Sequence, residues 1–202
     1  MPKSLSKKTS SKKRESIIKS ALSAFLELGY SGTTMDEVVK RAGGSKASIY
    51  KHFKNKEDLF ATVVDEMVRY RLPDELNLDD PPKQALLEYA ESRLQVVFTR
   101  KHVALRRLII GEGARISKIA RMYYEHGPGL SITQLEKYLQ AENARGSLKV
   151  KDPHASAAMF IGMLIHNMYL RSLFSVSAVP STAQMKAQAK KVVDTFLVAH
   201  KA

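Results

Sequence analysis

The chain of 202 residues contains no cysteine and no tryptophan. Without cysteine the protein has no disulfides, thiolate metal sites or cysteine nucleophiles, and this absence is typical of proteins in a reducing cytoplasm. Long apolar runs are also missing, since none approaches the roughly 18 residues that a membrane-spanning helix needs. The basic, serine-rich N-terminus is not followed by an apolar stretch. We therefore expect neither export nor membrane insertion.

Motifs for metal binding and catalysis are absent as well. The six histidines are scattered, and no two lie three or four residues apart, the spacing at which one helix presents two metal ligands. Glycine-rich nucleotide loops and the HExxH motif are not found, and Gly-Glu-Gly at 111–113 is too short to count as such a loop. We expect no metal, no cofactor and no enzymatic activity. Turnover in an enzyme assay panel would be needed to revive the enzyme interpretation.

Positive charge is concentrated in the first quarter of the chain. The formal net charge is +13, and residues 1–56 carry 13 Lys and Arg against 4 Asp and Glu, whereas residues 57–202 carry 20 against 16. A basic N-terminal module is typical of nucleic-acid binders, because neutralising phosphates releases counterions. On charge alone, a solvated basic tail explains the same excess equally well.

The N-terminal part divides into an arm and a helical domain. Residues 1–13 are rich in Ser and Lys and poor in apolar side chains, so we expect a flexible basic arm. From Arg14 to Leu28 apolar residues recur at helical spacing, and Gly29 supplies a stop. Thr34 is predicted to cap a second helix, with Glu37 completing a capping box.

A third and a fourth helix follow closely. Gly43 and Gly44 permit a tight turn with positive φ, and Ser45 can cap a short third helix over residues 46–53. Asn55 is the predicted cap of a fourth helix with an apolar stripe from Leu59 to Met67. We therefore expect a helix-turn-helix domain over residues 14–56, and a connecting helix followed by a further helical domain over residues 57–202.

The remainder of the chain is also helical in pattern. An acidic break follows Pro73, and helices are predicted over residues 82–100, 103–115, 117–125, 128–145, 153–174 and 181–200. Strand-like alternation is absent, and all seven prolines lie at element boundaries or in the arm. The predicted fold class is all-α.

The segment Thr33–Phe60 carries the strongest functional signal. Two short helices joined by a glycine-containing turn form a helix-turn-helix, in which the first residues of the second helix meet base edges. In this geometry Lys46 and Ser48 can donate to bases and Ala47 can lie against a thymine methyl, while Tyr50, His52 and Lys56 can reach phosphates. Alternatively, Tyr50 is a core aromatic and Lys46 a solvated lysine. Ile49 and Phe53 share one helix face, which favours an exposed Tyr50.

The sequence GYSGTTMDEVVKRAGGSKASIYKHFKNKEDLF resembles the N-terminal signature of the TetR-type repressors, unbroken from about Arg14 to Phe60. The resemblance implies a three-helix DNA-binding domain, a connecting helix, and a C-terminal domain that dimerises and binds an effector. It also implies the roles of the DNA-contacting residues. Thr34 and Tyr50 anchor phosphates, Lys46, Ala47 and Ser48 face bases, His52 and Lys56 flank the backbone, Ser45 lies at the start of the recognition helix, and Lys51 contacts DNA or faces solvent.

The segment Leu108–Gly129, LIIGEGARISKIARMYYEHGPG, resembles the C-terminal domain of AcrR- and AefR-like regulators. We therefore expect a cytoplasmic, one-component transcriptional regulator, a repressor that binds palindromic double-stranded operator DNA as a homodimer and is switched by a small molecule. A non-specific architectural DNA-binding protein is the alternative, but it leaves about 130 residues of apolar helix after Lys56 without a role.

The long helix expected from Ala155 to Phe174 has two apolar stripes. One contains Met159, Met163, His166 and Leu170, and the other contains Phe160, Leu164, Asn167 and Arg171. We expect one stripe to pack within its own domain and the other against a partner subunit, with the last helix as a second candidate for that interface. An effector pocket could include Phe98, Arg107, Met122, Tyr123, Met163 and His166, although a methionine stripe is more often core.

Overall fold

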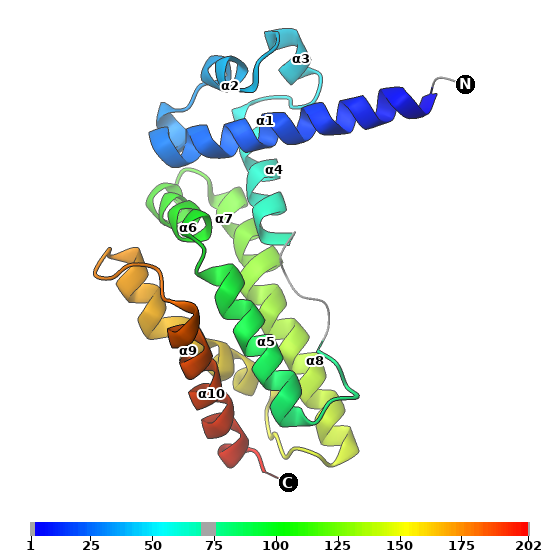
Figure 1. Cartoon of the computed structure of the whole chain (residues 1–202), viewed down its shortest axis with the longest axis vertical. Coiled ribbons are helices and arrows are strands. Elements are labelled where there is room, and N and C mark those ends of the chain that lie inside the picture. The colour runs from blue at the N-terminus through cyan, green and yellow to red at the C-terminus, as the bar shows by residue number, and fades with distance from the viewer. Residues whose placement is uncertain (1–2, 70–75, 202) are drawn as a thin grey trace. The chain divides into compact units, whose positions relative to one another are not determined.

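The computed structural model describes residues 3–69 and 76–201 (Figure 1). Within these ranges the regular structure is helical, apart from one isolated antiparallel bridge between Leu148 and Lys201. This confirms the predicted all-α class. The elements are α1 (Lys3–Gly32), α2 (Met35–Ala42), α3 (Lys46–Tyr50), α4 (Lys56–Arg69), α5 (Pro82–Val97), α6 (Arg100–Glu112), α7 (Ser117–Tyr124), the π-helical turn η1 (Glu125–Gly129), α8 (Leu130–Arg145), α9 (Pro153–Leu173) and α10 (Thr182–Ala199). No described helix is both long and apolar enough to cross a membrane.

The chain forms two compact units whose boundary differs from the predicted one at residue 56. The first unit comprises Met1–Met67 with Ala104–Met122, and the second comprises Val68–Val103 with Tyr123–Ala202. Most of α4 therefore belongs to the N-terminal unit. The reason is hydrophobic, since the apolar side chains on its inner face are fully buried there: Leu59, Phe60, Val63 and Val64.

Aromatic side chains hold the centre of the first unit. The rings of Phe25 in α1 and Phe60 in α4 meet edge to face with centroids 4.6 Å apart, and Tyr30 lies 5.0 Å from Phe60. Such geometry matches the quadrupoles of the rings and adds to the gain from burying them. The cluster fixes α4 against the C-terminal end of α1.

Helix α1 is longer at its start than the sequence predicts. It begins at Lys3 rather than near Arg14, so the segment expected to be a flexible arm is helical from Lys3 onward. No glycine or proline interrupts the stretch from Lys3 to Leu28, and lysine has a good helix propensity. Gly29 ends the regular helical course with φ of 75°, as predicted.

The second unit is a helical bundle built from α5, α8, α9 and α10 with one apolar core. Phe160 in α9 and Phe196 in α10 meet edge to face at 5.1 Å near its centre. The start of α10 is fixed by a complete capping box, in which Ser181 and Gln184 exchange hydrogen bonds with each other's backbone.

Two of the helix boundaries predicted from proline positions, at Pro128 and Pro73, are not confirmed. Pro128 was expected to start a helix, but it lies inside η1, whose wider turn tolerates the missing proline N–H. Pro73, the start of the predicted acidic break, lies outside the described residues. Within the later part of that break, Asn77 hydrogen-bonds Asp80 at 3.0 Å and closes a short turn.

We predict that Phe60→Ala destabilises the first unit by about 3–5 kcal/mol, because it removes a fully buried ring and leaves a cavity. Urea unfolding followed by circular dichroism measures this loss. Leu28→Ala is the control, since Leu28 is 45% exposed and its truncation should cost within about 0.5 kcal/mol. Equal losses for the two variants would contradict the assigned core.

Candidate nucleic-acid interface

Thr34 starts α2 as predicted, since its Oγ1 accepts a hydrogen bond from the backbone N–H of Glu37 at 3.1 Å. The expected return bond from Glu37 is replaced by an ion pair. The Glu37 carboxylate accepts from Arg41 Nε at 2.7 Å, because Arg41 lies one turn further along the same helix face. Thr34 uses its oxygen as an acceptor, so its hydroxyl proton can still be donated to a phosphate.

The turn between α2 and α3 needs glycine, as the sequence predicts. Gly43 and Gly44 have φ of 63° and 132°, and the second value lies in a region that other residues rarely adopt. A side chain at Gly44 would also meet the Lys13 ammonium at 3.0 Å. Lys13 Nζ donates to the carbonyl of Gly43, which ties the turn to α1. This role of Lys13 was not predicted, because residues 1–13 were expected to form a flexible arm.

Helix α3 divides its side chains between core and solvent. Ser45 caps the helix by accepting from the backbone N–H of Ser48 at 3.2 Å. Ile49 and Phe53 are each 2% exposed, whereas Tyr50 is 44% exposed. Tyr50 is therefore not a core aromatic, which confirms the predicted division of faces. Its hydroxyl is free of the core packing and can donate to an external acceptor.

The remaining residues expected at the DNA surface lie in or beside α3. The helix ends at Tyr50 rather than Phe53, and residues 51 and 52 continue it as a turn whose N–H groups donate to Ala47 and Ile49 carbonyls. Ala47 and Lys51 are exposed, and Ser48 and His52 are half-buried. The structure thus gathers Ser45–His52 on one short segment.

Lys46, the first residue of α3, forms an ion pair with Asp36 in α2. Its Nζ lies 2.8 Å from Asp36 Oδ1, and both side chains are more than half exposed. The hydrogen bond to Asp36 raises the pKa of Lys46. An exposed pair of this kind contributes little stability, so Lys46 can exchange Asp36 for a stronger acceptor at little cost. The role of Asp36 was likewise not predicted from the sequence.

Lys56 lies at the start of α4 and is half-buried. Its Nζ donates to the Tyr30 carbonyl at 2.9 Å and lies 4.6 Å from the centre of the Tyr30 ring. These contacts fix the end of α1 to α4. Its Nζ also donates to the Ser31 carbonyl at 3.5 Å, and because an ammonium group has three donors, one is left for a phosphate.

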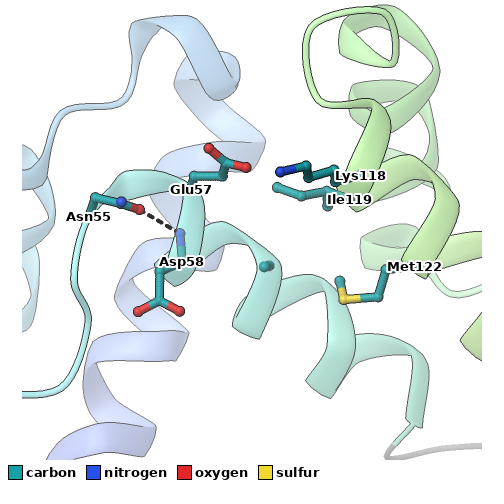
Figure 2. A pocket seen from close by; sticks show the side chains of 7 residues that line it. Asn55, Glu57, Asp58, Lys118, Ile119 and Met122 are labelled. Atoms are coloured by element: carbon teal, nitrogen blue, oxygen red, sulfur yellow. Dashed lines mark hydrogen bonds between the residues drawn. The ribbon is translucent and has the colours of Figure 1, made fainter.

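Two of the six residues expected at an effector pocket, Arg107 and Met122, belong to the first unit. Arg107 is exposed, and Met122 lines a hollow of about 390 Å³ between the start of α4 and α7 (Figure 2). Glu57 and Lys118 point toward one another across this hollow, and Asn55 Oδ1 accepts from the Asp58 N–H at 2.8 Å. Of the six candidates, only Met122 lines this hollow.

The other four candidates belong to the second unit and differ in their burial. Phe98 is 2% exposed and packs in the apolar core, whereas Met163 and His166 lie on the exposed side of α9 and Tyr123 is half-buried. The methionine stripe is therefore at the surface rather than in the core. In the described ranges no group of three or more His, Asp or Glu side chains is arranged to hold a metal ion.

Comparison with known proteins identifies both parts of the chain. Residues 17–63 match the family model for bacterial regulatory proteins of the tetR family, and residues 84–202 match that for the C-terminal domain of AefR-like transcriptional repressors. The biofilm operon negative regulator IcaR of Staphylococcus epidermidis is 39% identical over 57 residues, 28% of this chain and 31% of that relative. The HTH-type regulator YhgD of Bacillus subtilis is 29% identical over 158 residues, 76% of this chain and 81% of that relative.

Solved structures agree over nearly the whole chain. A TetR-family regulator from Mesorhizobium loti has a TM-score of 0.79 at 30% identity, with 96% of this chain and 98% of that one aligned. The flavonoid-responsive regulator FrrA also gives 0.79 at 30% identity, over 95% and 98% of the two chains. These relatives are transcriptional regulators and not enzymes, and the chain itself belongs to the TetR family, with an AefR-like C-terminal domain.

Proposed function

We propose that the protein represses transcription by binding a palindromic operator as a homodimer, and that a small molecule bound in the second unit releases it. The observation that carries the proposal is the division of faces in α3 and the turn that follows it, which buries Ile49 and Phe53 and leaves Lys46, Ala47 and Tyr50 toward solvent. As a regulator of bacterial genes it acts in the cytoplasm. Related proteins are named as a negative regulator and as flavonoid-responsive, which supports repression and ligand control.

Within the interface we assign Lys46, Ala47 and Ser48 to base edges. Thr34, Ser45, Tyr50, Lys51, His52 and Lys56 are assigned to the phosphate backbone. The division follows from position, because residues at the start of a recognition helix lie deepest in the major groove. Hydroxyl and ammonium groups further along the segment meet phosphates, which fix the register of the protein on DNA.

The exposed stripe of α9 is the proposed dimer interface. Met159 and Phe174 are 66% and 73% exposed, and Met163 and Leu170 lie between them on the same side of the helix. The opposite side, with Phe160 and Leu164, is fully buried in its own unit. A contiguous apolar stripe of this length is costly in water, and a second copy of the chain would cover it by helix-on-helix packing.

Lys46→Ala tests the assignment of a base reader. We expect it to relax the preference for one base pair in each half-site by about 1–3 kcal/mol, because a lysine that donates to a guanine edge discriminates against other bases. Fluorescence anisotropy on single-base operator variants measures this. Lys186→Ala, an exposed lysine outside the motif, is the control. An equal loss of affinity for every sequence would make Lys46 a phosphate contact instead.

Tyr50→Phe should weaken binding to operator and random DNA alike, because a phosphate contact carries no sequence information. The lost contact is neutral, so the slope of log K against log salt should stay nearly unchanged. Lys56→Ala is the charged counterpart and should lower that slope by about one per subunit. Anisotropy titrations at several salt concentrations measure both, and a change in base preference with Tyr50→Phe would refute its assignment.

Met159→Glu should convert the dimer to monomer at micromolar concentration, because it places a charge in the apolar stripe that a second copy covers. Sedimentation velocity measures the oligomeric state, and operator affinity should fall in parallel. Gln95→Glu on α5 adds the same charge at another exposed position and serves as the control. A wild-type chain that sediments only as a monomer would contradict the proposal, as would a dimer that the first substitution leaves intact.

A further inference from the structure

Arg93 in α5 is buried in the second unit, with 3% of its surface exposed. Its position within the helix places it beside residues of the apolar core, Ala90 and Leu94 among them. Arginine is among the residues least often buried without an ionic partner, because removing a charge from water is costly. A guanidinium at this place therefore needs a physical explanation.

The contacts of Arg93 are with neutral groups. Its Nη2 donates to Gln134 Oε1 in α8 at 2.7 Å, and its guanidinium lies 4.9 Å from the centre of the Tyr89 ring. Tyr89 in turn donates its hydroxyl proton to the Ser131 carbonyl at 2.8 Å. Burial lowers the pKa of the guanidinium, while Tyr89 acts in the opposite direction. Arginine nevertheless stays protonated in proteins, so the positive charge remains.

One donor of this buried guanidinium has no partner at all. Arg93 Nε is inaccessible to solvent and forms no hydrogen bond, and among the described residues no carboxylate forms an ion pair with Arg93. Gln134 satisfies one donor of five, and an aromatic face attracts the cation without neutralising it. Arg93 is therefore a buried cation with no counter-anion among the described residues.

We infer that Arg93 is the anchor of the effector site, and that the effector is an organic monoanion with an apolar body whose carboxylate binds the Arg93 guanidinium. This inference deepens the proposed function and rests on it. A guanidinium presents paired donors that match the two oxygens of a carboxylate. A single cation balances a single negative charge, which favours a carboxylate over a phosphate dianion. The surrounding apolar side chains suit a hydrocarbon or aromatic body.

The six effector candidates from the sequence do not include Arg93. The signal was nevertheless present, because Arg93 follows Leu86 and Ala90 at helical spacing on the apolar face of α5. A charged residue on such a face is either paired or functional. Gln134 is a neutral partner, and no described carboxylate forms an ion pair with Arg93, which favours the functional explanation.

The test compares matched acids and amides on wild type and on Arg93→Met in the full chain. The probes are decanoate with decanamide, and naphthoate with naphthamide. On wild type we expect the acids to raise the Tm and to release operator DNA, and the amides to do neither. Arg93→Met should weaken the response to the acids by roughly tenfold to a hundredfold, because it removes a charge-assisted hydrogen bond. Arg93→Lys should retain part of the response to the acids. Arg100→Met changes an exposed arginine and should retain the full response.

A second readout needs no ligand. If Arg93 serves a ligand, the free Arg93→Met protein should keep or raise its Tm, since a methionine of similar size replaces an unpaired buried charge. If the Tm of Arg93→Met falls markedly while the folded variant still binds the acids, Arg93 has a structural role only, and the inference is overturned. Amides that act as well as acids on wild type would also overturn it, while ligand control itself would stand. If neither acids nor amides act, both the ligand response and the inference fail, and operator binding is judged separately.

Discussion

The burial of Ile49 and Phe53 is the constraint on which the DNA-binding surface depends. Both side chains are almost fully enclosed, and they set the rotation of the five-residue helix α3 about its axis. With that rotation fixed, Lys46, Ala47 and Tyr50 point to solvent, and Lys46 also pairs with Asp36 in α2. Lys13, which donates to the Gly43 carbonyl, and Lys56, which donates to the Tyr30 carbonyl, secure the flanking chain. A recognition helix this short needs such external support, because an isolated helix of this length is unstable.

The second unit combines an apolar core with two features that are unfavourable in a single chain. The outer stripe of α9 is apolar and exposed, and Arg93 is charged and buried. Both cost free energy in the single chain, and we propose that a second copy covers the α9 stripe and that an anion pairs with Arg93. Stability and function therefore place opposite demands on these residues, as is common at functional sites.

Much of the fold was predictable from local signals. The caps at Thr34, Ser45 and Ser181, the glycines of the turn and the faces of α3 follow from residue type and spacing alone. The grouping of α4 with the first unit was not predictable from local signals, because it depends on the contact between Phe60 in α4 and Phe25 in α1. The π-helical course around Pro128 was likewise not predictable from local spacing. Helical spacing identifies residues on one face but does not say which neighbour that face meets.

We propose that a dimer of this chain reads a two-fold symmetric DNA sequence. Selection of bound fragments from a randomised DNA library by the purified protein, followed by sequencing, tests it most directly. The account predicts enrichment of one inverted repeat whose half-sites lie about 34–36 Å apart or further, and two chains or a multiple of two on each fragment. Recovery of a single unrepeated motif, or of no motif while DNA is still bound, would contradict it.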